Sequence, residues 1–266
     1  MNCSNVSGYI VDWLKQKIHE SNQKGFVIGV SGGIDSAVVS TLCALTDLPA
    51  YVINMPIHQA GDQFRRANEH ISFLTAKFKT ASAYTIDLTN CFNVLAESLV
   101  PEARGELALV NTRSRLRMVT LYAFANSNQC LVAGTGNKIE DYGIGFFTKY
   151  GDGGVDISPI GDLLKSEVYE MGTFLGVPES ILKAAPTDGL WETDRPDEAQ
   201  IGASYDELEW AMNYCSVHGI TNAAGINYPT KVSLRQSEVL KNYITRHIMN
   251  RHKMEMPSIC TLSGIK

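Results

Sequence analysis

A short segment rich in glycine and serine lies between an apolar run and a helix-forming pattern near the start of the chain. The apolar run covers residues 26–30, and the next residues read Ser31-Gly32-Gly33-Ile34-Asp35-Ser36. Glycine lets the backbone approach a ligand because it has no Cβ, and a helix N-terminus offers free N–H groups and a partial positive charge. A strand, this loop and a helix in that order predict a phosphate-binding site in an α/β fold. The alternative is an ordinary turn capped by Asp or Ser.

Asp35 is unexpected in a phosphate-binding loop because its carboxylate would repel phosphate oxygens. A bridging Mg²⁺ removes this conflict, since carboxylates and phosphates are both hard oxygen ligands. Glu140 comes soon after a later apolar run at 130–133, where a second carboxylate would complete the coordination of the ion. The alternative for Glu140 is an acidic residue in the first turn of a helix, where the helix dipole favours it.

Short apolar runs alternate with helical patterns along the chain. The runs cover residues 26–30, 51–54, 84–88 and 130–133, and their continuous hydrophobicity is typical of parallel strands covered on both faces. Helices are expected before the first run, over 106–124, and over 164–175 with Gly176 and Pro178 closing the last one. The pattern predicts a doubly wound, Rossmann-like α/β fold with a parallel sheet. Residues 185–202 are polar and are expected to form a long loop.

The composition narrows the classes of protein that the chain can represent. Its 266 residues are 44% hydrophobic with a net charge of −5, which suits one globular domain and gives no basic face for nucleic acid. We find no apolar stretch of the roughly 18 residues that span a membrane, and no secretion signal. The six cysteines form no C-x-x-C pair, and Cys43 and Cys130 are expected in the core. These features predict a cytoplasmic protein with reduced thiols.

Three arginines and an N-terminal apolar stripe leave alternatives open. At about 100° per residue, Arg115 faces away from Arg113 and Arg117, so we expect Arg115 to point into a site while its neighbours face water. The alternative is a solvated face for all three. The stripe consists of Ile10, Trp13, Leu14 and Ile18. It would contribute either to a dimer contact or to packing within its own domain.

The loop and two downstream motifs resemble a known enzyme family. The sequence of residues 31–36 resembles the PP-loop of the N-type ATP pyrophosphatases, whose fold is of the adenine nucleotide alpha hydrolase type. The segment Gly134-Thr135-Gly136-Asn137-Lys138-Ile139-Glu140 and the segment 146–156, FFTKYGDGGVD, are similar to ammonia-dependent NAD synthetase. One departure is clear: many members read G-T-D-H where this chain has Gly134-Thr135-Gly136-Asn137, so any role of that Asp and His cannot be transferred.

The resemblance implies functional residues at the positions where the motifs match. Asp35 and Glu140 would ligate Mg²⁺. The positions that correspond to ATP contacts are Gly29, Val30, Ser31, Gly32, Gly33, Ile34, Asp35, Ser36, Thr135, Lys165 and Thr187. The positions that correspond to contacts with deamido-NAD are Arg115, Lys149, Asp156, His252 and Lys253.

The resemblance also implies a reaction: ATP-dependent amidation of deamido-NAD with ammonia, through an adenylated intermediate, giving NAD, AMP and pyrophosphate. It further implies a homodimer and a single synthetase domain over residues 1–266, without the glutaminase domain of glutamine-dependent members. Two other functions remain open at this point. One is a different PP-loop enzyme, such as an adenylating amidotransferase or a tRNA thiolase, and the other is a module that senses ATP without turnover.

Overall fold

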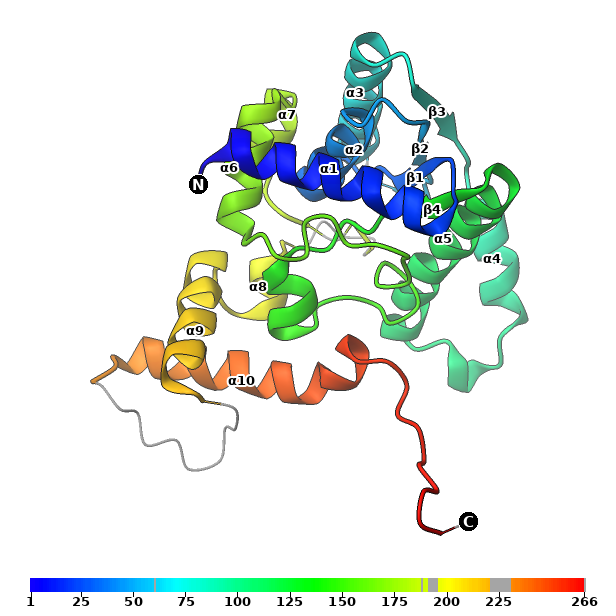
Figure 1. Cartoon of the computed structure of the whole chain (residues 1–266). Coiled ribbons are helices and arrows are strands. Elements are labelled where there is room, and N and C mark those ends of the chain that lie inside the picture. The colour runs from blue at the N-terminus through cyan, green and yellow to red at the C-terminus, as the bar shows by residue number, and fades with distance from the viewer. Residues whose placement is uncertain (60, 188, 191–195, 221–230, 266) are drawn as a thin grey trace.

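The protein is described here by a computed structural model that covers residues 1–59, 61–187, 189–190, 196–220 and 231–265. Its sheet has four parallel strands in the order β3-β2-β1-β4, at the upper right of Figure 1. The strands are β1 (Gly25–Gly29), β2 (Ala50–Asn54), β3 (Ala81–Thr85) and β4 (Cys130–Val132). The prediction of a parallel, doubly wound α/β sheet is confirmed.

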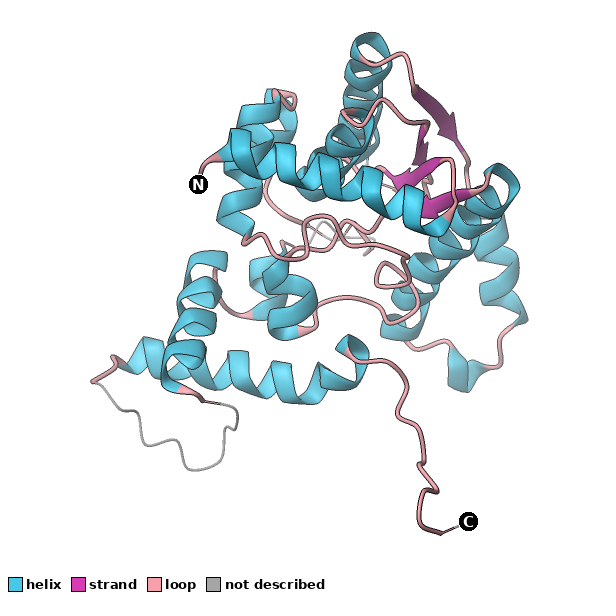
Figure 2. Cartoon of the chain, in the orientation of Figure 1, coloured by secondary structure: helices cyan, strands magenta, loops and turns pink. Residues whose placement is uncertain are grey.

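Helices surround the sheet and form a further layer beneath it (Figure 2). Before and between the strands lie α1 (Cys3–Ser21), α2 (Ile34–Ala44), α3 (Gly61–Lys77), α4 (Thr89–Ser98), the 3-10 turn η1 (Pro101–Ala103) and α5 (Glu106–Asn128). After β4 come η2 (Lys138–Ile144), α6 (Lys165–Leu175), α7 (Glu179–Leu182), α8 (Asp197–Ile201), α9 (Tyr205–His218) and α10 (Leu234–Met254). As expected, α6 ends at Gly176, which has a φ of 77°. Within the described residues, we find no helix long and apolar enough to cross a membrane.

Alternate residues of the central strands pack into separate cores on the two faces of the sheet. Phe26 and Ile28 of β1 join the core formed with α1, α2, α3 and α6. Val27 of the same strand joins the core formed with α4 and α5. Continuous hydrophobicity in β1 therefore reflects burial on both faces, as the sequence predicted. Cys43 and Cys130 lie in these cores, also as predicted.

The third strand differs from its prediction. It covers residues 81–85 rather than 84–88, and its last three residues, including Tyr84, are exposed. β3 lies at the edge of the sheet, so neighbouring elements cover it less than they cover β1. Residues 86–88 leave the strand toward α4, where Leu88 becomes the N-cap and is buried. The apolar run thus marks a strand end and a helix start, not a strand covered on both faces.

The N-terminal stripe packs within its own domain. Ile10, Leu14 and Ile18 are buried in the core that α1 shares with α2 and α6, and Trp13 packs against that core. The suggestion that this stripe forms part of a dimer contact is therefore wrong for its buried residues. They are already covered by their own chain.

The C-terminal helices form a layer with a core of their own. Residues of η2, α8, α9 and α10 pack together, with Ile139, Leu208 and Leu240 fully buried. In Figure 1 this layer lies below the sheet, on the far side of the loops that follow β4. The predicted loop 185–202 contains the short helix α8, which begins after Pro196. Residues 188 and 191–195 of that loop lie outside the described residues.

Candidate active site

The predicted phosphate loop has the geometry of an anion site. Gly32 has a φ of 84°, and a Cβ there would lie 2.5 Å from the Gln63 carbonyl oxygen, so only glycine fits. The Ser36 hydroxyl accepts from the Ser31 N–H at 3.2 Å and donates to the Gly33 carbonyl at 3.0 Å. Gly33 is the N-cap of α2 and has no side chain, so it leaves the first-turn N–H groups open to a ligand.

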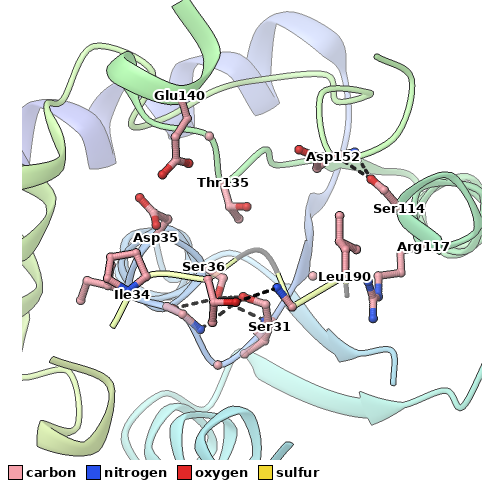
Figure 3. Close-up of a pocket in the computed structure, with 18 of the residues that line it drawn as sticks. Ser31, Ile34, Asp35, Ser36, Ser114, Arg117, Thr135, Glu140, Asp152 and Leu190 are labelled. Carbon is pink, nitrogen blue, oxygen red and sulfur yellow. Dashed lines mark hydrogen bonds between the residues drawn. The ribbon is translucent and has the colours of Figure 1, made fainter. Parts of the chain in front are cut away.

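A large pocket opens at this loop, outside the carboxyl ends of β1, β2 and β4 (Figure 3). This is where ligands bind in doubly wound sheets. Every residue that the sequence assigned to ATP or Mg²⁺ lines it: Gly29, Val30, Ser31, Gly32, Gly33, Ile34, Asp35, Ser36, Thr135, Glu140, Lys165 and Thr187.

Asp35 and Glu140 converge on one buried cation, the ammonium of Lys165. Lys165 Nζ lies 2.6 Å from Asp35 Oδ2 and 2.9 Å from Glu140 Oε1, and the lysine is only 3% exposed. Burial opposes the charged ammonium, but the two carboxylates outweigh it and raise the pKa of Lys165. Burial raises the pKa of Asp35, whereas Lys165 and Tyr205 outweigh burial and lower the pKa of Glu140. The site thus already balances negative charge with a cation.

The two carboxylates also fit a divalent cation. The ammonium shows that a positive charge is held where both oxygens meet, and Mg²⁺ prefers such hard oxygen ligands. Among residues 1–59, 61–187, 189–190, 196–220 and 231–265 we find no group of three or more His, Cys, Asp or Glu that could hold a metal. A metal at Asp35 and Glu140 would therefore take its other ligands from phosphates and water, as Mg²⁺ usually does in nucleotide sites.

The structure explains the departure at Gly136 and Asn137. A Cβ at Gly136 would overlap the Asp141 carboxyl group, which occupies the space beside this glycine and lines the pocket. Burial, then the charges of Asp152, Glu140 and Asp35, hold the pKa of Asp141 well above its usual range. An acidic group is therefore present beside position 136, although it comes from a different residue.

Asn137 connects the Asp35 carboxylate to the backbone of η2 at Glu140. Its Nδ2 donates to Asp35 Oδ1 at 3.0 Å, while its Oδ1 accepts from the N–H groups of Ile139 and Glu140 at 3.1 Å. The side chain therefore caps η2 and ties the start of that helix to the loop after β1. This role needs an amide that both donates and accepts.

The opposite side of the pocket carries two residues outside the predicted ATP and Mg²⁺ positions. Asp152 accepts from the Ser114 hydroxyl at 2.6 Å and from the Thr148 N–H at 3.0 Å. Arg117 donates from Nε to the Met55 carbonyl at 2.9 Å. In Figure 3 both lie across the pocket from Asp35 and Glu140. Met55 follows β2 directly. Because ligands bind outside the carboxyl ends of parallel strands, this position in the sequence could have indicated that side of the pocket.

The prediction that Arg113 and Arg117 face water was wrong. Arg113 is buried, donates to the Leu190 carbonyl, and holds its guanidinium 4.7 Å from the Phe92 ring centroid. Arg117 lines the pocket, and Arg115 is the exposed member. α5 packs against the sheet and also borders the pocket. A larger part of its circumference is therefore covered than in an amphipathic surface helix.

The residues assigned to deamido-NAD do not line this pocket, and four of them gather at one other place. Lys149 donates to the His252 carbonyl, and the Arg115 guanidinium lies 3.4 Å from the Lys149 carbonyl oxygen. Lys253 Nζ donates to the carbonyls of Gly145 and Phe147, both at 2.9 Å.

Asp156 stands apart from those four residues. Its carboxylate accepts from the Tyr122 hydroxyl at 3.0 Å and from the Val132 N–H at 2.8 Å, beside the end of β4. The structure thus brings together Arg115, Lys149, His252 and Lys253 at the end of α10, and places Asp156 against the sheet.

Comparisons with known proteins agree with the fold and with the family that the sequence resembles. The family model described as NAD synthase matches residues 6–257. The NH3-dependent NAD⁺ synthetase of Mesoplasma florum is 41% identical over 206 residues, which cover 76% of this chain and 81% of that relative.

Solved structures give the same result over nearly the whole length. The NMN synthetase from Francisella tularensis superposes with a TM-score of 0.81 at 32% identity, covering 97% of this chain and 98% of the other. The NH3-dependent NAD synthetase from Campylobacter jejuni, in complex with nitrate ion, gives a TM-score of 0.77 at 25% identity, covering 98% of this chain and 100% of the other. The chain therefore belongs to the NAD synthase family.

Proposed function

We propose that the protein amidates deamido-NAD with ammonia at the expense of ATP, giving NAD, AMP and pyrophosphate. The observation that carries this proposal is the pocket in which the open N-terminus of α2 lies beside the buried Lys165 ammonium, which pairs with the carboxylates of Asp35 and Glu140. An anion site and a pair of carboxylates in one pocket suit a nucleotide triphosphate bound with a cation. Membership of the NAD synthase family supports the same reaction.

The reaction needs positioning more than a reactive side chain. The nicotinate carboxylate oxygen attacks the α-phosphorus of ATP, the bond between the α-phosphorus and the bridging oxygen breaks, and pyrophosphate leaves. The nitrogen of ammonia then attacks the activated carbonyl carbon, AMP departs, and the nitrogen loses a proton. The loop N–H groups and Lys165 would hold the phosphates in line, with Thr135 and Thr187 as further ATP contacts. When bound at Asp35 and Glu140, Mg²⁺ would offset the charge of the phosphates.

We propose that the basic group at the end of α10 binds the part of deamido-NAD that lies away from the reacting carboxylate. Arg115, Lys149, His252 and Lys253 supply cationic or hydrogen-bonding groups that suit phosphates. Asp156, which accepts two hydrogen bonds beside β4, is assigned to the same substrate by the family motif. An Arg115→Ala variant should raise KM for deamido-NAD at least severalfold and leave KM for ATP unchanged. An equal rise in both values would remove this assignment.

A second candidate substrate follows from one comparison. The Francisella tularensis protein, whose structure gives a TM-score of 0.81 with this chain, is an NMN synthetase. Amidation of the mononucleotide of nicotinate is chemically the same reaction on a shorter substrate. The residues at the end of α10 would then contact nothing on the substrate, so the Arg115 variant would show no effect.

One assay separates these candidates. Purified protein is mixed with ATP, Mg²⁺, ammonium and one acceptor, and pyrophosphate and the amidated product are both measured. We expect more pyrophosphate to be released with deamido-NAD than with the nicotinate mononucleotide. No pyrophosphate should be released with xanthosine monophosphate or tRNA. A higher kcat/KM for the mononucleotide would transfer the proposal to NMN synthesis. No release with either nicotinate compound would reject both.

We also propose a cytoplasmic homodimer in which residues 1–266 form one synthetase domain. The stretch from α4 to the first turn of α5 exposes apolar side chains at Val94, Leu95, Val100 and Leu107, which supports a contact there. The free state of all six cysteines supports a reducing compartment. Light scattering at micromolar concentration should give twice the mass of the chain, and a Leu95→Asp variant should give a lower mass. A monomeric wild-type protein would refute the dimer.

A further inference from the structure

Tyr205 connects the start of α9 to the candidate cation site. It is the first residue of α9, it packs in the separate core of that layer, and it is 6% exposed. Its hydroxyl lies 2.6 Å from Glu140 Oε1 and 3.3 Å from Asp197 Oδ2. A phenol has one hydrogen to donate, and the shorter distance assigns it to Glu140.

The position of this tyrosine is fixed from several sides. Ser204 and Glu207 form a reciprocal capping box at the start of α9, with N–H bonds of 3.2 Å and 3.0 Å. The Tyr205 N–H donates to Glu198 Oε1 at 3.0 Å. A tyrosine hydroxyl carries its hydrogen near neutral pH and can donate it. The ring therefore offers a constant hydrogen-bond donor at a constant place.

Tyr205 and Lys165 meet at the same oxygen of Glu140. The ammonium donates to Oε1 at 2.9 Å and also lies 4.9 Å from the Tyr205 ring centroid, a cation–π distance. The proposed function requires Lys165 to contact ATP and Glu140 to hold Mg²⁺. If the ammonium turns toward the phosphates, its bond to Glu140 is lost, whereas the Tyr205 bond remains.

We propose that Tyr205 is a positioning residue that holds the Glu140 carboxylate in place for the divalent cation of the nucleotide complex. The proposal rests on the proposed function, because that function assigns Mg²⁺ to Asp35 and Glu140. The hydroxyl acts through Glu140 and does not touch the nucleotide. It fixes the rotamer of a carboxylate whose partner Lys165 has another task when ATP is bound.

The test is a Tyr205→Phe variant, which keeps the ring and removes only the hydroxyl. ATP binding is measured by calorimetry, without the second substrate, over a series of free Mg²⁺ concentrations and in EDTA. We expect the Mg²⁺ concentration for half-maximal tightening of ATP binding to rise about tenfold, since hydrogen bonds to charged groups are among the strong ones. ATP affinity in EDTA should change less than twofold. Tyr214→Phe, on the same helix and in the same core, is the matched control and should match wild type.

A double variant shows whether Tyr205 acts through Glu140. Adding Tyr205→Phe to Glu140→Gln should change ATP affinity at any Mg²⁺ concentration by less than twofold. A further tenfold loss of ATP affinity in the Glu140→Gln background would overturn the proposal. An unchanged Mg²⁺ requirement in the Tyr205→Phe single variant would also overturn it, whether or not the Tm of that variant is lower. If wild type itself binds ATP no more tightly with Mg²⁺ than in EDTA, the assignment of Mg²⁺ in the proposed function fails first, which is a different result.

Discussion

His70 should make the stability of this protein fall in mild acid. The side chain is fully buried between α2 and α3, with Nε2 2.8 Å from the Ser40 hydroxyl and the ring 5.8 Å from that of Phe73. Its Nδ1 has no hydrogen-bond partner among the residues that the structure describes. Burial lowers the pKa of His70 from 6.5 to about 4, because the charged imidazolium would lose its hydration.

The size of the effect follows from the difference between the folded and unfolded pKa. The unfolded chain binds a proton at His70 near pH 6.5 and the folded chain does not. The free energy of unfolding is therefore highest above that pH and falls as the pH drops below it. At pH 5 the loss is about 2 kcal/mol, and below pH 4 it approaches about 3.4 kcal/mol, at about 1.36 kcal/mol for each pKa unit.

Urea unfolding of wild type and a His70→Gln variant at pH 8, 6 and 5 measures this loss. Glutamine can still bond to Ser40 but does not titrate, so the variant lacks this part of the pH dependence. Between pH 8 and 5, wild type should lose about 2 kcal/mol more free energy of unfolding than the variant. His19→Gln, at an exposed position in the last turn of α1, should behave as wild type does. Equal losses in wild type and His70→Gln would refute the reasoning.

Three further predictions concern the active site. Asp35→Asn and Glu140→Gln each keep one carboxylate paired with Lys165, so circular dichroism should show a folded chain. Turnover should fall at least a hundredfold in each variant. Near-normal activity at saturating Mg²⁺ would exclude both residues from the mechanism. Gly136→Ala should displace the Asp141 carboxyl and lower kcat/KM severalfold, and the loss should largely disappear when Asp141→Ala is combined with it; a full loss in the double variant would show a backbone effect instead. With ammonium the rate should climb between about pH 7 and 9 as free ammonia increases, and glutamine should not replace ammonium. Burial raises the pKa of the Cys43, Cys130 and Cys215 thiols, which disfavours the thiolate that a glutaminase needs; synthesis from glutamine in an ammonia-free preparation would contradict this.

The local parts of the fold were predictable from the sequence because neighbouring residues determine them. The loop after β1 needs glycine at position 32 for its backbone, and the end of α6 needs Gly176 in the left-handed region. The third strand was misplaced because periodicity does not tell a strand at the sheet edge from one covered on both faces. Its apolar residues 86–88 belong partly to the start of α4.

The site could be predicted only where a motif carried it. Ser204 and Glu207 indicate the start of a helix in the sequence. The residues around Tyr205 do not indicate that its side chain contacts Glu140, which is 65 positions away along the chain. The bond between Asn137 and Asp35 spans 102 positions and depends on how η2 packs against the loop after β1. Such contacts result from the packing of whole elements, which a single sequence does not display.

The separate core of the C-terminal layer means that the two walls of the pocket belong to two cooperative units. One wall is continuous with the sheet and its cores, and the other, with Glu140 and Asp197, is continuous with η2, α8, α9 and α10. The core of this layer is smaller than the two cores of the sheet together, so we expect the layer to open at a lower free energy and its amides to exchange hydrogen with solvent sooner. A nucleotide bound to both walls couples the two units, and its binding energy then adds to the stability of the layer that opens first.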